Sequence, residues 1–187
     1  MIFLGILAGI LILGYIWYVS LVGKKNSALE ALSSIDVQLK KRHDLLPNIL
    51  KIAKKFMDHE KDIMTRVTEM RALAGKSYDR GNADEVAGHL AAESGLSAAM
   101  MQFFAVAENY PDLKSNQNMV RAQETFEEVE GHIAAARRFY NSCVTSLNNA
   151  VQIFPGNIIA GLANIQSMPF FEMAEGEKKP VDASDFL

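Results

Sequence analysis

The chain has 187 residues, a formal net charge of −3 and a hydrophobic content of 49%. This length suits one compact domain or one elongated bundle and excludes two ordinary domains, and the net charge gives no reason to expect a polyanionic partner. The single cysteine, Cys143, excludes an internal disulfide, and we interpret it as a small buried apolar residue.

The first 22 residues contain no charged side chain. A helix of about 20 apolar residues is long enough to cross a bilayer, and the stretch has neither the basic start nor the clear cleavage site of a signal peptide. We therefore expect a retained single-pass transmembrane anchor at residues 1–22. Tyr15, Trp17 and Tyr18 lie near its C-terminal end, where aromatic rings prefer the headgroup layer.

Lys24 and Lys25 follow the apolar stretch directly. The positive-inside rule therefore predicts that the N-terminus lies outside and that the remaining chain lies in the cytoplasm. Gly5 and Gly9 have the GxxxG spacing, which lets two membrane helices approach closely. This pair predicts self-association within the membrane.

Beyond the anchor, apolar residues recur at alternating steps of four and three from Ala28 to Ala74, at 12 of 14 positions. This spacing is typical of a helix with one packed seam, and it predicts one long helix over residues 25–73, bent near Pro47. Arg42 falls on the seam, so its guanidinium needs a carboxylate partner. We expect that partner among the acidic residues of a later helix: Glu124, Glu127, Glu128 and Glu130.

Two further helices are predicted after a loop that contains Gly75 and Gly81. The second begins after Asn82, which resembles a capping box with Glu85, and runs to about Tyr110. The third begins after Ser115 and ends at Pro155. Their expected core residues are Val86, Leu90, Leu96, Met100, Phe103, Ala107, Met119, Phe126, Val129, Ile133, Ala136, Tyr140, Val144, Leu147 and Val151.

These elements predict an all-α fold with an N-terminal transmembrane helix and an elongated antiparallel three-helix bundle. The expected divisions are an anchor at residues 1–22, a bundle at 23–154, a short apolar C-terminal helix at 155–172 and a flexible tail at 173–187. Residues 23–76 carry 12 Lys+Arg and 7 Asp+Glu, and the later residues carry 7 and 15. A basic half and an acidic half favour packing on each other or on neighbouring copies.

No motif for catalysis, for a cofactor or for a metal ion appears in the sequence. His59 and Glu60 begin like a zinc-protease motif, but the second histidine is missing. The pairs Glu85/His89 and Glu128/His132 have four-residue spacing, which suits ordinary contacts on a helix surface. The basic run at residues 40–43 is flanked by acidic residues and lacks aromatic side chains, so we expect no nucleic-acid partner.

Four blocks in a fixed order carry a family resemblance: SSIDVQLKKRHDLLPNIL, ENYPDLKSNQNM, AARRFYNSCVTSLNNAVQIFP and PFF. The chain resembles the LemA family of bacterial membrane proteins over residues 19–172. The resemblance implies an N-terminal anchor in the bacterial inner membrane, a helical bundle and no assigned catalytic residue. One departure from the family pattern is Met57–Asp58, where a basic or glycine-containing turn is expected.

The residues marked by these blocks make sense as packing sites. We expect a polar network that fixes the register of the first and third helices, and aromatic plugs at two helix ends. The predicted network consists of Asp36, Arg42, Asp44, Pro47, Asn48, Arg137, Tyr140 and Asn141. The predicted helix-end plugs are Tyr110, Pro111, Phe154 and Pro155.

The leading hypothesis is a non-enzymatic, membrane-anchored scaffold that self-associates into a homo-oligomer. Its expected partners are the lipid bilayer and other copies of the chain, with another membrane protein as a further candidate. Self-association is expected because the apolar segment near the C-terminus has no place in a three-helix core. The expected oligomer interface is Gly5, Gly9, Ile158, Ile159, Leu162, Ile165, Phe170 and Phe171. One alternative is a regulatory adaptor for a membrane protease or sensor, and another is a hydrolase that uses Asp36, His43 and Asp44.

Overall fold

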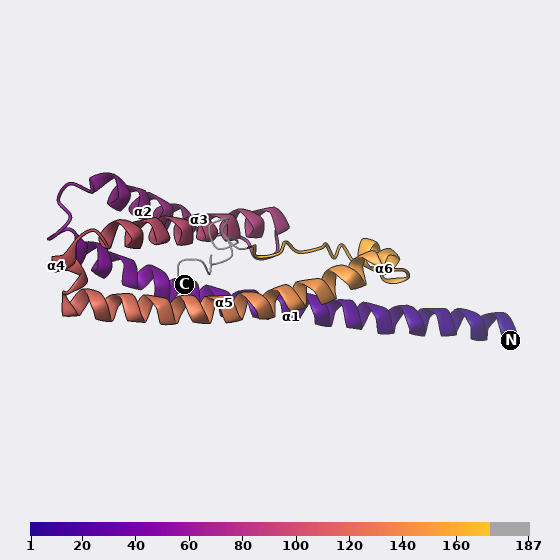
Figure 1. Cartoon of the computed structure of the whole chain (residues 1–187). Helices are drawn as coiled ribbons and strands as arrows, with labels where there is room; N and C mark the ends of the chain where they lie inside the picture. Colours follow the sequence, from indigo (N-terminus) through magenta and orange to yellow (C-terminus); the bar gives the residue numbers. More distant parts are fainter. Residues whose placement is uncertain (173–187) are drawn as a thin grey trace, which may run out of the picture.

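The computed structural model describes residues 1–172, and this part of the chain is helical without any strand (Figure 1). The predicted tail, residues 173–187, lies outside the described residues. The helices are α1 (Ile2–Ala53), α2 (Lys61–Ala74), α3 (Ala83–Ala107), α4 (Pro111–Lys114), α5 (Gln117–Gln152) and α6 (Gly156–Leu162).

Helix α1 runs without interruption from the uncharged N-terminal stretch into the bundle. Its 52 residues correspond to a length of about 78 Å. The predicted seam is confirmed here, because Leu32, Leu39 and Ile49 are buried. The helix continues through Pro47. In contrast, the side chains of the first 20 residues are almost all exposed, and nothing in the described chain covers most of them.

The prediction that this helix extends to Leu73 is wrong. The helix ends at Ala53, and the chain reverses through residues 54–60, where Met57 is 1% exposed. Helix α2 then packs against α3 instead of continuing α1. The seam positions Val67 and Ala74 are still buried, but they belong to the core that α2 shares with α3.

The bundle therefore contains four long helices, α1, α2, α3 and α5, where the sequence predicted three (Figure 1). Helices α1 and α5 pack along most of the bundle in opposite directions. The Nζ of Lys24 lies 2.8 Å from the Oγ of Ser146, and the guanidinium of Arg42 lies 2.8 Å from a carboxylate oxygen of Glu130. These two contacts fix the antiparallel register.

Helices α3 and α5 follow the predictions closely. The Asn82 side chain accepts hydrogen bonds from the backbone N–H groups of Asp84 and Glu85, so this capping residue is confirmed. Helix α5 is capped by Asn116 and not by Ser115. The predicted core residues of both helices are buried, except Ala136 and Val151, which are partly buried.

Only residues 156–162 of the predicted C-terminal helix are helical. The following residues 163–172, here called the C-terminal strap, begin with a turn at 163–164 and then run back along the bundle as an extended segment (Figure 1). Ile165, Met168 and Phe171 are buried in the core that α1, α3 and α5 share. The apolar character of this segment therefore reflects packing within the same chain, against the expectation that it has no place in the core.

Candidate functional site

The most polar part of the interior is an ion cluster formed by Arg42, His43, Glu93 and Glu130. Arg42 is fully buried in the seam of α1. Its guanidinium forms an ion pair with Glu93 of α3 and a second with Glu130 of α5, at 2.8 Å. A buried arginine requires such partners because an unpaired charge in the core is costly. The predicted partner Glu130 is confirmed.

Glu93 is the second buried charge, and the sequence reasoning missed it. Its side chain is 1% exposed and contacts both Arg42 and His43, whose Nε2 lies 3.0 Å from the Glu93 Oε1. The polar residues His89, Glu93 and Ser97 recur every four residues on the largely apolar α3. This polar stripe is the signal in the sequence that could have revealed the partner. The cluster therefore ties α1, α3 and α5 together in one register.

A second polar group surrounds Asp36, which lies nearly two turns before Arg42 on α1. The Asp36 carboxylate pairs with Arg80 at 2.6 Å and accepts a hydrogen bond from the Tyr78 hydroxyl at 2.9 Å. Tyr78 and Arg80 both come from the loop between α2 and α3. The ring of His89 stacks on Tyr78 with a centroid distance of 4.1 Å, and its Nε2 lies 3.7 Å from the Asp36 Oδ1. These contacts hold the loop against α1.

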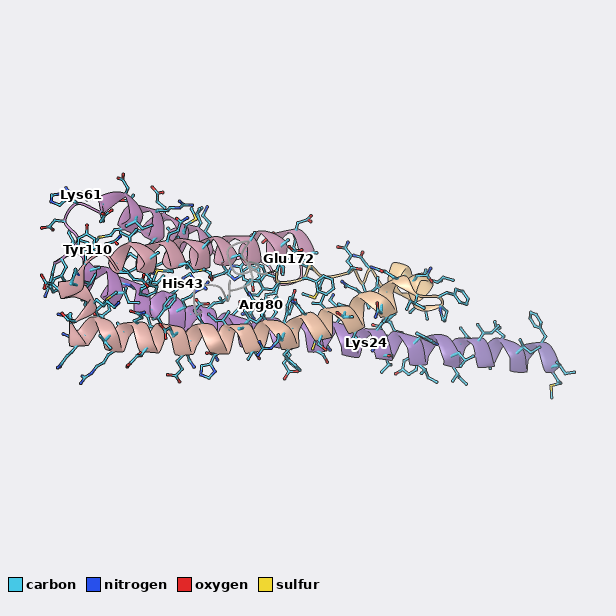
Figure 2. The ribbon with its side chains drawn as sticks, viewed as in Figure 1. Lys24, His43, Lys61, Arg80, Tyr110 and Glu172 are labelled. Atoms are coloured by element: carbon cyan, nitrogen blue, oxygen red, sulfur yellow. The ribbon has the colours of Figure 1, made fainter. Side chains whose placement is uncertain are left out.

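The two groups border one open groove of about 890 Å³. The groove lies between α1, the C-terminal end of α2 and the loop 75–82, and Figure 2 labels His43 and Arg80 among its side chains. Its lining mixes Lys40, Lys76 and Arg80 with carboxylates. No single charge dominates, so the groove does not have the chemistry of a site dedicated to anions or to cations.

The carboxylates of Glu93 and Asp36 are both held in the charged form. Burial alone would raise the pKa of Glu93, but the hydrogen bond from His43 and the charge of Arg42 outweigh it and keep the pKa below its ordinary value of 4.5. Burial likewise opposes ionisation of Asp36, and its contacts with His89, Tyr78 and Arg80 keep its pKa below 3.8. Burial and the adjacent Asp36 charge raise the pKa of the Tyr78 hydroxyl, which therefore stays a donor.

These shifts predict a loss of stability in acid. Since the folded-state pKa of Glu93 lies below the unfolded-state value, its contribution is complete above about pH 4.5 and is lost as the pH falls through the folded-state pKa. We expect the Glu93→Gln variant to be less stable at neutral pH and to show a shallower dependence of stability on pH below about 4.5. Denaturant titrations across this range measure both effects. The exposed Glu128→Gln variant is the control, and an equally steep acid slope in Glu93→Gln would contradict the assignment.

The predicted network of eight residues does not form one network. Asp44 faces solvent and pairs with Lys40 one turn earlier, at 3.1 Å. Pro47 and Asn48 lie within α1 and line separate surface grooves. Asp36 and Arg42 belong to the two polar groups described above. The reason is geometric, because Asp36, Arg42 and Asp44 point in different directions around α1.

The remaining predicted network residues, on α5, hold the C-terminal strap. The Asn141 side chain exchanges two hydrogen bonds with the backbone of Phe171, at 3.0 and 2.9 Å. Asn148, two turns later, does the same with Met168. The Tyr140 hydroxyl donates to the Pro169 carbonyl, and the Arg137 guanidinium lies 5.8 Å from the centre of the Phe171 ring. The side-chain amides thus satisfy backbone groups that an extended segment would otherwise leave unpaired.

The predicted helix-end plugs have different surroundings. The Tyr110 hydroxyl donates to Glu60 at 2.9 Å, which joins the end of α3 to the start of α2, and Pro111 begins α4. Phe154, however, is 73% exposed, so it does not plug a helix end, and Pro155 precedes α6.

The predicted interface residues near the C-terminus are only partly available to another copy. Ile165 and Phe171 are buried in the bundle and Ile159 is partly buried, whereas Ile158, Leu162 and Phe170 are exposed.

The hydrolase alternative is not supported by this geometry. Asp36, His43 and Asp44 all line the groove, but His43 contacts Glu93, and no hydrogen bond among the described residues joins it to either aspartate. Within residues 1–172, His, Cys, Asp and Glu do not gather in a group of three or more that could hold a metal ion. The arrangement can fix helix register, but it lacks a nucleophile paired with a base.

These features define a membrane-associated helical bundle with an N-terminal apolar helix. Among residues 1–172, two helices are long and apolar enough to cross a membrane; α1 carries its apolar stretch exposed, and α3 buries part of its own in the bundle. The LemA family model matches residues 31–184, and the chain belongs to the LemA family. The resemblance seen in the sequence is thereby confirmed.

Two kinds of relatives are similar to this chain. Protein LemA of Metamycoplasma hominis is 27% identical over 98% of this chain and 84% of its own length. Magnetosome protein MamQ 2 of Paramagnetospirillum magneticum is 23% identical, and Magnetosome protein MamQ of Magnetospirillum gryphiswaldense is 22% identical. Each of these two alignments covers 80% of this chain and 62% of the magnetosome protein, so this chain spans less than two thirds of their length.

Proposed function

We propose that the protein is a non-enzymatic scaffold that is anchored in the membrane by residues 1–22 and self-associates there. The observation that carries this proposal is the continuity of α1, which joins the exposed apolar stretch to the bundle without a flexible linker. One half of α1 is packed in the bundle, and the other half is the apolar stretch. Because the two halves form one helix, the position of the membrane segment is transmitted to the bundle. The family membership supports the membrane association, and Lys24 and Lys25 support a cytoplasmic bundle.

Self-association is assigned to the face of the anchor that carries Gly5 and Gly9. Neither glycine has a neighbouring atom within 4 Å of an added Cβ, so this chain leaves the face open. Helices with this spacing pack closely because the missing side chains let two backbones approach. We expect copies to meet through this face, with the bundles held side by side above the membrane.

The test is the mass of the full-length protein in mild detergent, measured by light scattering with correction for the detergent. The Gly5→Leu/Gly9→Leu variant should shift the population toward the monomer, because leucine keeps the backbones apart. Gly14→Leu is the matched control. Gly14 also has open space around it, and nine residues at about 100° each place it opposite Gly5. An unchanged mass in the double variant would contradict the assigned face.

A regulatory adaptor is the second candidate, and the open groove favours it. The groove is large enough to receive a peptide segment, and its lining combines charged side chains with the aromatic side chain of Tyr78. A photo-crosslinking residue in place of Lys76 would then capture one defined heterologous membrane protein in native membranes. Capture of other copies alone would leave the scaffold as the better description.

A further inference from the structure

The described chain contains a second uncharged stretch, and it meets the first. Residues 139–171 contain no Asp, Glu, Lys or Arg, and they include the end of α5, α6 and the C-terminal strap. Helix α6 packs against α1, where Leu21 and Val22 share a core with Ile159 and Ala160. A Cβ on Gly156 would lie 3.8 Å from the ring of Trp17. Helix α6 therefore lies beside the last turns of the apolar stretch of α1.

The register of α1 and α5 places α6 on the membrane side of the first lysine. The Nζ of Lys24 is bonded to Ser146, and α5 continues for six more residues toward the N-terminal end of α1, which is about 9 Å. Figure 2 agrees, since α6 lies on the N-terminal side of Lys24. If Ile2 to Leu21 spans the bilayer, these 20 residues cover about 30 Å, which is the thickness of the hydrocarbon core. Trp17 and Leu21 then lie in the last turns before the headgroups.

At this depth, α6 and the turn that precedes it expose large apolar side chains. Ile153 is 60% exposed, Phe154 73%, Ile158 55% and Leu162 86%. These four residues, here called the apolar edge, lie within ten positions, whereas the other exposed apolar side chains of the bundle are scattered. An apolar group of this kind in water is unfavourable, and no other part of the described chain covers it. With the proposed span in the bilayer, the surroundings at that level of the molecule are lipid.

We propose that the apolar edge inserts into the boundary between the headgroups and the acyl chains, so that the protein has a second, peripheral contact with the same bilayer. This inference rests on the proposed membrane span. Since the segment has no basic residue, its attraction to the membrane is hydrophobic and does not require anionic lipid. The second contact lies to one side of α1, so it limits the tilt and rotation of the bundle on the membrane surface.

The test uses the full-length protein in phosphatidylcholine vesicles with bromine atoms on the acyl chains near the headgroup. Trp17 is the single tryptophan of the chain, so its emission reports first on the span itself. In the Trp17→Phe background, the Leu162→Trp variant should lose about half of its emission to brominated lipid and resist quenching by iodide. Val120→Trp in the same background is the control, since Val120 is 41% exposed far from α6 and should respond to iodide alone.

The outcomes separate the proposed span from the proposed insertion of the apolar edge. In one outcome, brominated lipid quenches Trp17 but not the tryptophan of Leu162→Trp, and iodide quenches the latter strongly. This result would place α6 in water and overturn the inference while leaving the span intact. Protection of Leu162→Trp from both quenchers would mean that another copy covers the edge, which also overturns it. If brominated lipid does not quench Trp17, the proposed span is wrong, and the inference that rests on it is wrong as well. Circular dichroism confirms that each variant is folded.

Discussion

Replacement of Arg42 by leucine is expected to lower the free energy of unfolding by about 3–5 kcal/mol, because it leaves the buried Glu93 carboxylate without its main counter-charge. Glu130 loses its partner as well, but its side chain is 28% exposed and can turn toward water. Denaturant unfolding of the full-length protein in detergent, followed by circular dichroism, measures the change.

Two further variants make this prediction specific. Lys40→Leu removes the ion pair between Lys40 and Asp44 within α1, in which both side chains are more than half exposed, and it should leave the denaturant midpoint unchanged. Arg42→Met combined with Glu93→Met should recover part of the loss, since a buried pair replaced by apolar residues leaves no unpaired charge. If Arg42→Leu lowers the free energy of unfolding by no more than Lys40→Leu does, the ion cluster does not stabilise the bundle.

Gly156→Ala is the second change with a large expected effect. A Cβ at this position would lie 2.0 Å from the carbonyl oxygen of Ala150, so the turn between α5 and α6 must open. We expect a loss of about 1–3 kcal/mol, which is typical of overpacking at a rigid site. The displaced α6 should also change the emission of Trp17, whose ring faces Gly156.

The matched control for this change is Gly161→Ala in the same helix. Nothing lies within 4 Å of a Cβ at Gly161, so alanine should be neutral or slightly stabilising through its higher helix propensity. If the two substitutions change the free energy of unfolding equally and leave the emission of Trp17 unchanged, α6 does not pack against α1 as described.

The helical faces could be predicted from the sequence, but the continuity of the helices could not. The seam spacing correctly identifies Leu32, Leu39 and Val67 as buried. The same spacing continues across residues 54–60, where the chain reverses, because a hairpin between two helices can preserve the phase of an apolar repeat. This turn contains neither glycine nor proline, and it buries Met57 in the core. The departure from the family pattern at Met57–Asp58 lies in this turn.

The candidate site could be predicted in part. A charged residue on an apolar seam needs a partner, and this argument found Glu130 for Arg42. It missed Glu93, because the search was confined to the acidic third helix and the chain was expected to have three helices. The partners of Asp36, in contrast, come from the loop 75–82, and no periodicity predicts which loop side chains reach a helix.

The role of the C-terminal strap could not be read from its composition. An apolar segment without a place in a three-helix core predicts an external interface, but Ile165 and Phe171 are buried in the core that α1, α3 and α5 share. The hydrogen bonds of Asn141 and Asn148 to the strap backbone depend on two residues spaced two turns apart on α5. That spacing is visible in the sequence, but its meaning depends on the extended segment beside it.

The continuity of α1 from the membrane into the bundle is the central claim, and a distance measurement between two spin labels tests it most directly. Leu13→Cys and Val37→Cys, in a Cys143→Ser background, place labels at two exposed positions of α1. For one rigid helix, the 24 intervening steps predict a single narrow distance distribution centred near about 36 Å in reconstituted vesicles. A broad distribution that extends to much shorter distances would reveal a hinge near Gly23 and would contradict the account.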